Sequence, residues 1–431
     1  MITLRDRVTA SLIILVPLAI LWEDIPQGHL LALYLSSFIC LALSVAEDTQ
    51  GVSVNKHLAL FMLYNAAWFA YWLSRFYVKT IPLQIVLIGI DAILVMMVGV
   101  IIYNAVSESK APLQYWYNHI CIAVAIQAAL CICQHHFFNP VESVLSLVTK
   151  VDYGTWGDAR TAAGSFGNTN YAGAFLAIGL PLFLHEATSV QWRPPLHDFN
   201  RNRWNYIPPL CFFTVPVLIG KVVIRIWKAN KWILASPFVA YALYLTHCRT
   251  AMIAVLIVGA FHVYRRSILN SKYSLMIGAA LATLLIFAVY YLASYNLGSF
   301  KVRYDEFWRG PLLAWVSSWH TFIFGVGPGV PARGNNFLHS EIIPLIWNFG
   351  LLGVLVVGDY IKKTIHGIKD VPEVLAFSFF VILIDALGNH VLHIPATALM
   401  CIFIVALIEK SLPKLAPSET RGGLEEALRR R

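Results

Sequence analysis

Residues 232–265 read WILASPFVAYALYLTHCRTAMIAVLIVGAFHVYR, two apolar runs separated by a short polar turn at 246–250. A helix crosses the hydrocarbon core of a bilayer with about twenty mainly apolar residues, and the two runs predict a pair of transmembrane helices. The turn between them is so short that Arg249 must lie close to the bilayer surface. A guanidinium is costly there unless it meets an anion, so the stretch predicts an anion contact at the shared end of two helices.

The whole chain has the same character. Of its 431 residues, 58% are hydrophobic and 13% are charged, whereas soluble chains are about 45–50% apolar and about 25% charged. The mean hydropathy is +0.66. This composition excludes soluble enzymes, nucleic-acid binders and disordered proteins, despite a net charge of +9.

Scanning for apolar runs gives thirteen candidate spans, near 8–23, 28–46, 56–77, 82–105, 117–137, 170–186, 207–222, 232–247, 250–265, 273–294, 340–360, 372–389 and 395–410. The run 207–222 has cations on both sides and contains three prolines, which weaken a helix. We interpret it as a re-entrant or interfacial element on the cytoplasmic side. The fold class predicted is therefore an all-α polytopic membrane protein with about twelve transmembrane helices, whose external loops are helical or irregular.

Cationic residues give the orientation, because they collect in cytoplasmic loops. With both termini in the cytoplasm, 23 of the 32 Lys and Arg residues lie inside and nine lie outside. The predicted organisation is an N-terminal set of transmembrane helices (1–137), a core (138–410) with external loops at 138–169 and 295–339, and a cytoplasmic tail (411–431).

Several kinds of chemistry have no motif in the sequence. The seven cysteines are odd in number and form no CxxC pair, so neither a disulfide framework nor a zinc site is indicated. The glycine-rich stretch 325–329 lacks the Lys-Ser/Thr of a P-loop. No HExxH motif and no metal-binding acidic pair is present. We expect no metal ion and no other cofactor.

The external polar residues offer a site instead. Arginine presents a planar fork of donors that suits phosphate oxygens, so Arg249 and Arg303 are candidates to clamp a diphosphate at the membrane surface. His339, at the start of an apolar helix, is either a capping residue or a base that takes a proton from a hydroxyl. Asn168 and Asn170 either cap a helix or contact a sugar.

Two further features bear on alternatives. Asn389, His390 and His393 occupy the last external turn, and we expect them to face lipid headgroups rather than a substrate path. A transporter would need ionisable groups within the membrane, and Asp91 and Asp385 lie in predicted helices without an evident partner. A transporter or flippase is therefore the weaker hypothesis.

Four stretches, over roughly residues 155–410, resemble the signatures of one known protein family. Residues 160–173, RTAAGSFGNTNYAG, resemble its GtFGNPNxxA signature, and CRT at 248–250 resembles its Ser-Arg-Gly/Thr turn. VRYDEFW at 302–308, followed by GVGPG at 325–329, resembles its R-x-x-x-W and GVGPG stretch, with one residue more between Arg303 and Trp308. His339 stands eleven residues before Gly350, the spacing of the family's HNxxLxxxxExG helix. Together the four stretches resemble the O-antigen ligase and polymerase superfamily. The departures include Thr169, Cys248, Ser340 and Asn348, where the family has proline, serine, asparagine and glutamate.

The resemblance implies a glycosyltransferase of the bacterial inner membrane, with its active site on the periplasmic side. It implies transfer of a preassembled glycan from undecaprenyl diphosphate to a hydroxyl acceptor, with lipid A-core (a ligase) ahead of a growing glycan (a polymerase). The expected partners are these two substrates and membrane lipids, with no nucleic acid.

The resemblance also assigns roles to residues. His339 becomes the general base, Arg249 and Arg303 the catalytic countercharges, and Arg160 a third cation at the donor. The remaining substrate-binding candidates are Asn168, Asn170, Arg309 and Asn336.

Overall fold

The computed structural model describes residues 2–19, 56–78, 94, 97–137, 162–166, 168–189, 235–263, 265, 282, 283, 286, 290, 303–327, 340–389 and 395–412. Regular structure within these residues is entirely helical, so the all-α class is confirmed for the described part of the chain. Its elements are α1 (Leu4–Ala19), α3 (Lys56–Tyr77), α5 (Leu113–His136), α7 (Thr169–Ser189), α9 (Arg249–Val263), the π-helix η4 (Arg303–Trp308), α12 (Arg309–Val316), α13 (Trp319–Phe324), α14 (Ile342–Gly367), the 3₁₀-helix η5 (Ile368–Asp370), α15 (Glu373–Asp385) and α16 (Pro395–Ser411).

Two described helices, Leu113–His136 and Ile342–Asp370, are long and apolar enough to cross a membrane. Shorter apolar helices are found at Met97–Ser107, Thr169–Phe183, Ala235–Leu245 and Arg249–His262. The predicted spans 28–46 and 207–222 lie outside the described residues, as does most of 273–294. Membrane association is thus indicated, while the number of twelve spans stays a prediction.

Helix starts follow from local chemistry. The Thr3 hydroxyl accepts a hydrogen bond from the amide of Asp6 at 3.1 Å, and the Asp6 carboxylate accepts one from the amide of Thr3 at 2.9 Å. This reciprocal pair is a capping box, which satisfies two amides at the start of α1. Asn168 caps α7 with a single hydrogen bond, which its Oδ1 accepts from the backbone amide of Asn170 at 2.9 Å.

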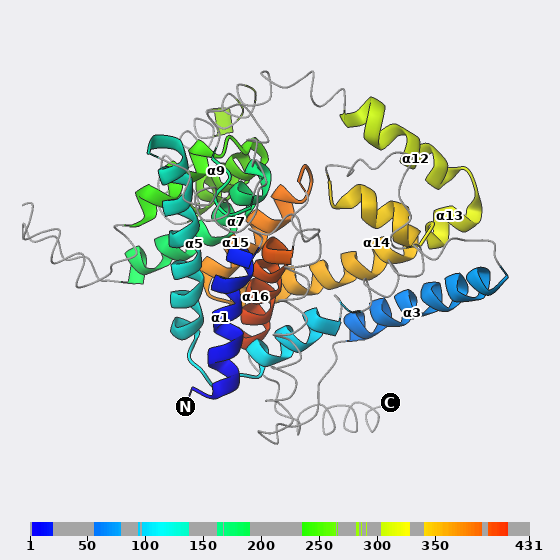
Figure 1. The fold of residues 1–431 in the computed structure, drawn as a ribbon, viewed down its shortest axis with the longest axis horizontal. Helices are drawn as coiled ribbons and strands as arrows, with labels where there is room; N and C mark the ends of the chain where they lie inside the picture. Colours follow the sequence, from blue (N-terminus) through cyan, green and yellow to red (C-terminus); the bar gives the residue numbers. More distant parts are fainter. Residues whose placement is uncertain are drawn as a thin grey trace, which may run out of the picture.

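Helix α15 is the centre of the main helix group and packs on α7, α9 and α16 (Figure 1). At one end of α15, Asp385 accepts a hydrogen bond from Thr250 of α9. At the other end, the Glu373 carboxylate lies 3.2 Å from Nδ1 of His262 in the last turn of α9. The two helices are therefore antiparallel, and α1 and α5 complete the group by packing on α16 and α7.

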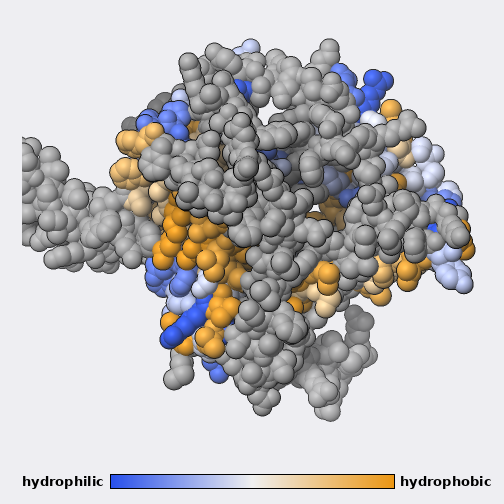
Figure 2. Space-filling view, viewed as in Figure 1, coloured by the Kyte–Doolittle hydropathy of each residue, from blue (hydrophilic) through white to orange (hydrophobic). Residues whose placement is uncertain are grey.

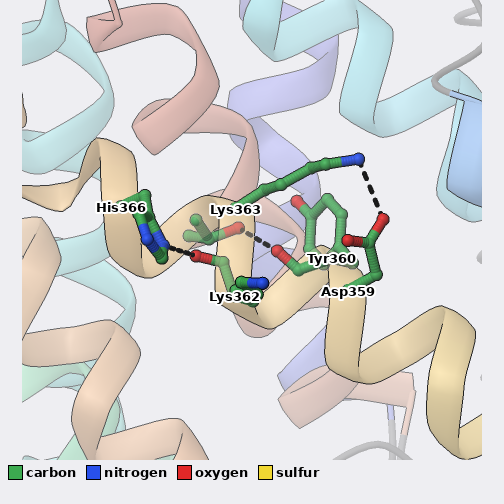
Figure 3. A network of polar contacts seen from close by, with 6 residues as sticks. Asp359, Tyr360, Lys362, Lys363 and His366 are labelled. Carbon is green, nitrogen blue, oxygen red and sulfur yellow. Dashed lines mark hydrogen bonds and ion pairs between the residues drawn. The ribbon is translucent and has the colours of Figure 1, made fainter.

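A second group contains α12, α13 and α14, with α3 packed on α14 (Figure 1). The chain passes from this group to the first through η5, at the end of α14. Near that end, Lys363 pairs with Asp359 at 2.8 Å, and the Thr364 hydroxyl donates to the Tyr360 carbonyl at 3.0 Å (Figure 3). The last two turns of α14 are therefore polar, in contrast to its apolar first half.

Large apolar side chains remain exposed on several helices. On α3 they include Leu63, Tyr71, Leu73 and Tyr77, and Figure 2 shows hydrophobic surface along this helix and over α5. Soluble monomers rarely present apolar surface of this extent. The distribution agrees with helices that face lipid.

Candidate functional site

The candidate site lies where the first turns of α7 and α9 meet the last turn of α15. The backbone carbonyl of Asn170 accepts a hydrogen bond from the side-chain Nδ2 of Asn389 at 3.1 Å. A second link, at 3.6 Å, joins Sγ of Cys248 to the same carbonyl. Three segments that are far apart in sequence thus meet at one end of the helix group, and those of Asn170 and Cys248 belong to motif stretches.

The turn at 246–250 is tightly built. The Thr246 hydroxyl donates to the Leu243 carbonyl at 2.7 Å and accepts from the Cys248 amide at 3.2 Å. His247 adopts φ 54°, the left-handed conformation that reverses the chain in this turn. As a result Arg249 becomes the first residue of α9, where its side chain is half-buried and its Nη1 atom is enclosed.

Gly173 allows α7 to approach this turn. A Cβ atom at this position would lie 2.2 Å from Cβ of Cys248 and 2.9 Å from the Thr246 hydroxyl. Only glycine permits such a contact. The glycine that ends the RTAAGSFGNTNYAG motif therefore sets the distance between α7 and the turn that carries Arg249.

Asp385 and Asn389 form a buried polar pair behind the turn. Asp385 is fully buried and is hydrogen-bonded to Thr250 and, at 3.5 Å, to the Asn389 amide. Its Oδ1 atom has no hydrogen-bond partner among the described residues. The expectation that Asp385 lacks a partner was wrong, because the tight turn brings Thr250 against α15. The expectation that Asn389 faces headgroups was also wrong, since only 4% of it is exposed; His390 and His393 lie outside the described residues.

Helix α5 fixes the segment that leads into α7. Oε1 of Gln134 accepts hydrogen bonds from the amides of Ala163 and Gly164, at 3.1 and 2.8 Å. The Gln127 carboxamide binds the Ser165 amide at 3.1 Å. The Ala162 amide donates to the Leu245 carbonyl at 3.1 Å, which ties this segment to the residue before the Arg249 turn.

The start of α14 reaches the same end of the molecule. The Glu341 amide donates to the Ala386 carbonyl at 2.9 Å, and the Ser340 hydroxyl accepts from the Ile342 amide at 3.2 Å. Ser340 is therefore a buried capping residue beside the end of α15. His339 immediately precedes it in sequence.

The backbones of Gly325 and Gly350, which both belong to motif stretches, are in direct contact. Gly350 has φ 60° and ψ −159° and kinks α14, and a Cβ on it would lie 2.5 Å from the Gly325 nitrogen. The kink frees the carbonyls of Trp347 and Asn348, which accept hydrogen bonds from the amides of Val326 at 2.9 Å and Gly327 at 3.0 Å. The GVG of the GVGPG stretch is thus joined to α14, which the sequence predicted as one uninterrupted span at 340–360.

The predicted site residues are distributed as follows. Arg249, Asn168 and Asn170 come together, with Asn168 acting as a helix cap. Arg309 is exposed on α12, which packs on α13 and α14. Arg303 begins η4, but its side chain lies outside the described residues, as do Arg160, Asn336 and His339 entirely.

Positive helix ends gather at this end of the helix group. The starts of α7, α9 and α14 converge here and each carries a partial positive charge, whereas the end of α15 carries a partial negative one. Arg249 adds a full positive charge at the start of α9. Among the described residues, no three His, Cys, Asp or Glu side chains are grouped as metal ligands.

Comparison of the chain with protein-family models, with characterised proteins and with solved structures finds no match. The family resemblance therefore rests on the motif residues themselves.

Proposed function

We propose that this protein is a polytopic membrane glycosyltransferase of the O-antigen ligase type. It moves a preassembled glycan from undecaprenyl diphosphate to a hydroxyl acceptor at the periplasmic face of the inner membrane. The supporting observation is that Arg249 is held half-buried at the start of α9, beside the starts of α7 and α14, at one end of an apolar helix group. That arrangement suits a membrane-embedded anion such as a lipid diphosphate.

In the proposed mechanism, arginine side chains offset the charge that develops on the leaving diphosphate. Arg249 and Arg303 have this role, with Arg160 as a third cation. Preorganised charge of this kind is often the largest catalytic contribution. His339 takes the proton of the acceptor hydroxyl as the hydroxyl attacks the anomeric carbon, and direct attack inverts that carbon.

Two contacts between helix ends agree with the proposed orientation, in which both termini lie in the cytoplasm. A contact between predicted external ends is the hydrogen bond from the Asn389 side chain to the Asn170 carbonyl. A contact between predicted cytoplasmic ends is the hydrogen bond from Lys410 to the Ser109 carbonyl. Each contact pairs ends that the charge distribution assigns to one side of the membrane.

We favour lipid A-core as the acceptor, ahead of a growing glycan. The loop at 295–339 is too short for a separate external domain, which disfavours protein-glycosylating members. A transporter of the same lipid-linked glycan is the remaining alternative. It is less favoured because Asp385, an ionisable group it could use, is engaged by Thr250 and Asn389.

The test is reconstitution of the purified protein with a lipid-diphosphate glycan and lipid A-core, with a second donor as the acceptor in a parallel reaction. The product identifies a ligase or a polymerase. His339→Ala should lower kcat by about 10²–10⁴-fold, the usual contribution of a general base. Transfer at the wild-type rate in this variant would show that His339 is not the base.

A second variant tests the diphosphate contact. Arg249→Lys keeps the charge but loses the fork of donors, so the apparent affinity for donor should fall about tenfold or more. Arg265→Lys is the matched control, since Arg265 is exposed near the other end of α9. Equal donor affinity in the two variants would argue against diphosphate recognition by Arg249.

A further inference from the structure

A long uncharged stretch connects the charged η4 helix with α14. No Asp, Glu, Lys or Arg occurs at 310–332, whereas η4 carries Arg303, Asp305 and Glu306. Within this stretch α12 and α13 form a helical hairpin beside the first half of α14 (Figure 1). A loop exposed to water is expected to carry charged residues along its length. The lack of charge indicates that this stretch does not lie in water.

The hairpin exposes large apolar side chains from both helices. The exposed fractions are 59% for Leu313 and 57% for Val316 on α12, and 63% for Trp319, 37% for Phe322 and 40% for Phe324 on α13. Leu313 and Val316 are three residues apart, as are Trp319 and Phe322, so each pair occupies one helix face. Each helix thus presents an uncovered apolar face.

The corner between α12 and α13 satisfies its own polar groups. The Ser317 hydroxyl donates to the Ala314 carbonyl at 2.7 Å, and the Thr321 hydroxyl donates to the Trp315 carbonyl at 2.9 Å. The indole of Trp315 donates to the Phe322 carbonyl at 2.9 Å and stacks on the Phe322 ring at 5.0 Å. Backbone groups need such internal partners where water is absent.

The position of the hairpin along α14 is fixed by a contact between two glycines. Gly325, directly after α13, contacts Gly350 of α14. Gly350 is eight residues after Ile342, which places it about 12 Å along the helix from its start. Just beyond, Leu352 and Leu355 of α14 are exposed as well, 38% and 57%. The apolar surface of the hairpin is therefore continuous with that of a membrane-capable helix.

We propose that α12 and α13 form a re-entrant hairpin whose exposed apolar side chains lie among lipid acyl chains in the periplasmic half of the bilayer. This inference rests on the membrane placement given under the proposed function. The η4 charges lie at the headgroup level, and the chain then descends beside α14 to the glycine joint. The occupant of the apolar faces is the bilayer itself, because the hairpin carries no charge beyond Arg309 at its start, next to η4, and adjoins a lipid-facing helix.

Photocrosslinking in nanodiscs of phosphatidylethanolamine and phosphatidylglycerol tests the proposal. The photoreactive residue p-benzoyl-phenylalanine replaces Phe322 or Leu313 in the full chain, one position at a time. Leu355, exposed on α14, is the positive control, and Lys369, exposed on η5, is the negative control. Lipid adducts are quantified by mass spectrometry.

The expected adduct yield at Phe322 and Leu313 is within about threefold of that at Leu355 and about tenfold above that at Lys369, as for side chains at hydrocarbon depth. Adducts at Leu355 with none at the two hairpin positions would overturn the hairpin and leave the membrane span intact. Absence of adducts at Leu355 as well would overturn the membrane placement of α14, and with it both the hairpin and the proposed function.

Discussion

Gly173 is the residue on which the geometry of the Arg249 turn depends most directly. Replacing it with alanine places a methyl group 2.2 Å from Cβ of Cys248, so α7 and the turn must separate. We expect Gly173→Ala to lower the free energy of unfolding by about 1–3 kcal/mol, the usual cost of overpacking. Donor affinity should fall with it, because Arg249 moves with the turn. Thermal unfolding in detergent and donor binding measure the two effects.

Gly259 provides the matched control for this prediction. It lies in the interior of α9, and a Cβ atom on it would meet nothing within 4 Å. Gly259→Ala should raise stability by up to about 1 kcal/mol, because alanine favours a helix over glycine. Equal melting temperatures for the two variants would show that the close approach of α7 has no energetic weight.

At the scale of elements, the joint between α13 and α14 depends on two glycines with positive φ. A side chain at Gly350 would meet the Gly325 nitrogen and the Ile323 carbonyl at 2.5 Å, and its φ of 60° adds about 1–2 kcal/mol of strain. We expect Gly350→Ala to lower the free energy of unfolding by more than this strain alone, because the steric overlap adds to it; thermal unfolding measures the change. Gly358→Ala, an open position on the same helix, should be neutral or stabilising.

The two glycines form one joint, so their effects should not add. Gly325→Ala breaks the same contact, and residues in contact show interaction energies of about 0.5–3 kcal/mol. The double variant should therefore be less destabilised than the sum of the single variants in thermal unfolding. Strict additivity would indicate that the two backbone segments act independently.

Gln134 of α5 holds the segment before α7 through two hydrogen bonds from backbone amides. Gln134→Leu removes the side-chain partner of the Ala163 and Gly164 amides, and unmet buried amides cost about 1–3 kcal/mol each. Hydrogen exchange at these amides should accelerate while exchange in α9 is unchanged. Gln114→Leu, at an exposed position of α5, is the control. Unchanged exchange in the Gln134 variant would mean that other contacts hold this segment.

Sequence predicted the elements better than their contacts. The runs 56–77 and 250–265 correspond closely to α3 and α9, because a span depends on local composition alone. The partners of Asp385 could not be predicted, because they depend on which helices pack together. The same holds for the kink at Gly350, since only the approach of Gly325 reveals why α14 bends there.

The site was predicted in part for the same reason. Arg249 followed from a short turn between two apolar runs, a feature that one stretch of sequence contains. Asn389 was misassigned because burial of an asparagine depends on the carbonyl it meets, here that of Asn170 on a distant segment. The spacing of Asp385 and Asn389, four residues apart in and beyond α15, was the available signal.

At the scale of the whole molecule, the proposed membrane orientation can be tested at the two ends of α14. The α14 and η5 helices together extend from Ile342 to Asp370 over 29 residues, about 43 Å of path length through the kink at Gly350 at the usual helical rise, against a hydrocarbon core of roughly 30 Å. We therefore expect the polar last turns with Lys363 and Asp359 (Figure 3) to emerge on one side of the membrane and η4 to lie on the other. Asp305→Cys should react with a charged thiol reagent in intact spheroplasts.

Lys369→Cys should react at least about tenfold more slowly until the membrane is opened, because a charged reagent does not cross the bilayer. The parent chain controls for its own cysteines, of which Cys121, Cys131, Cys248 and Cys401 are buried. Reaction of Lys369→Cys but not of Asp305→Cys in intact spheroplasts would show that the membrane orientation is the reverse of the one proposed. Rapid reaction at both positions in intact spheroplasts would place both ends of α14 on the outside. It would therefore mean that α14 does not cross the membrane, and the distribution of positive charge would not orient this helix.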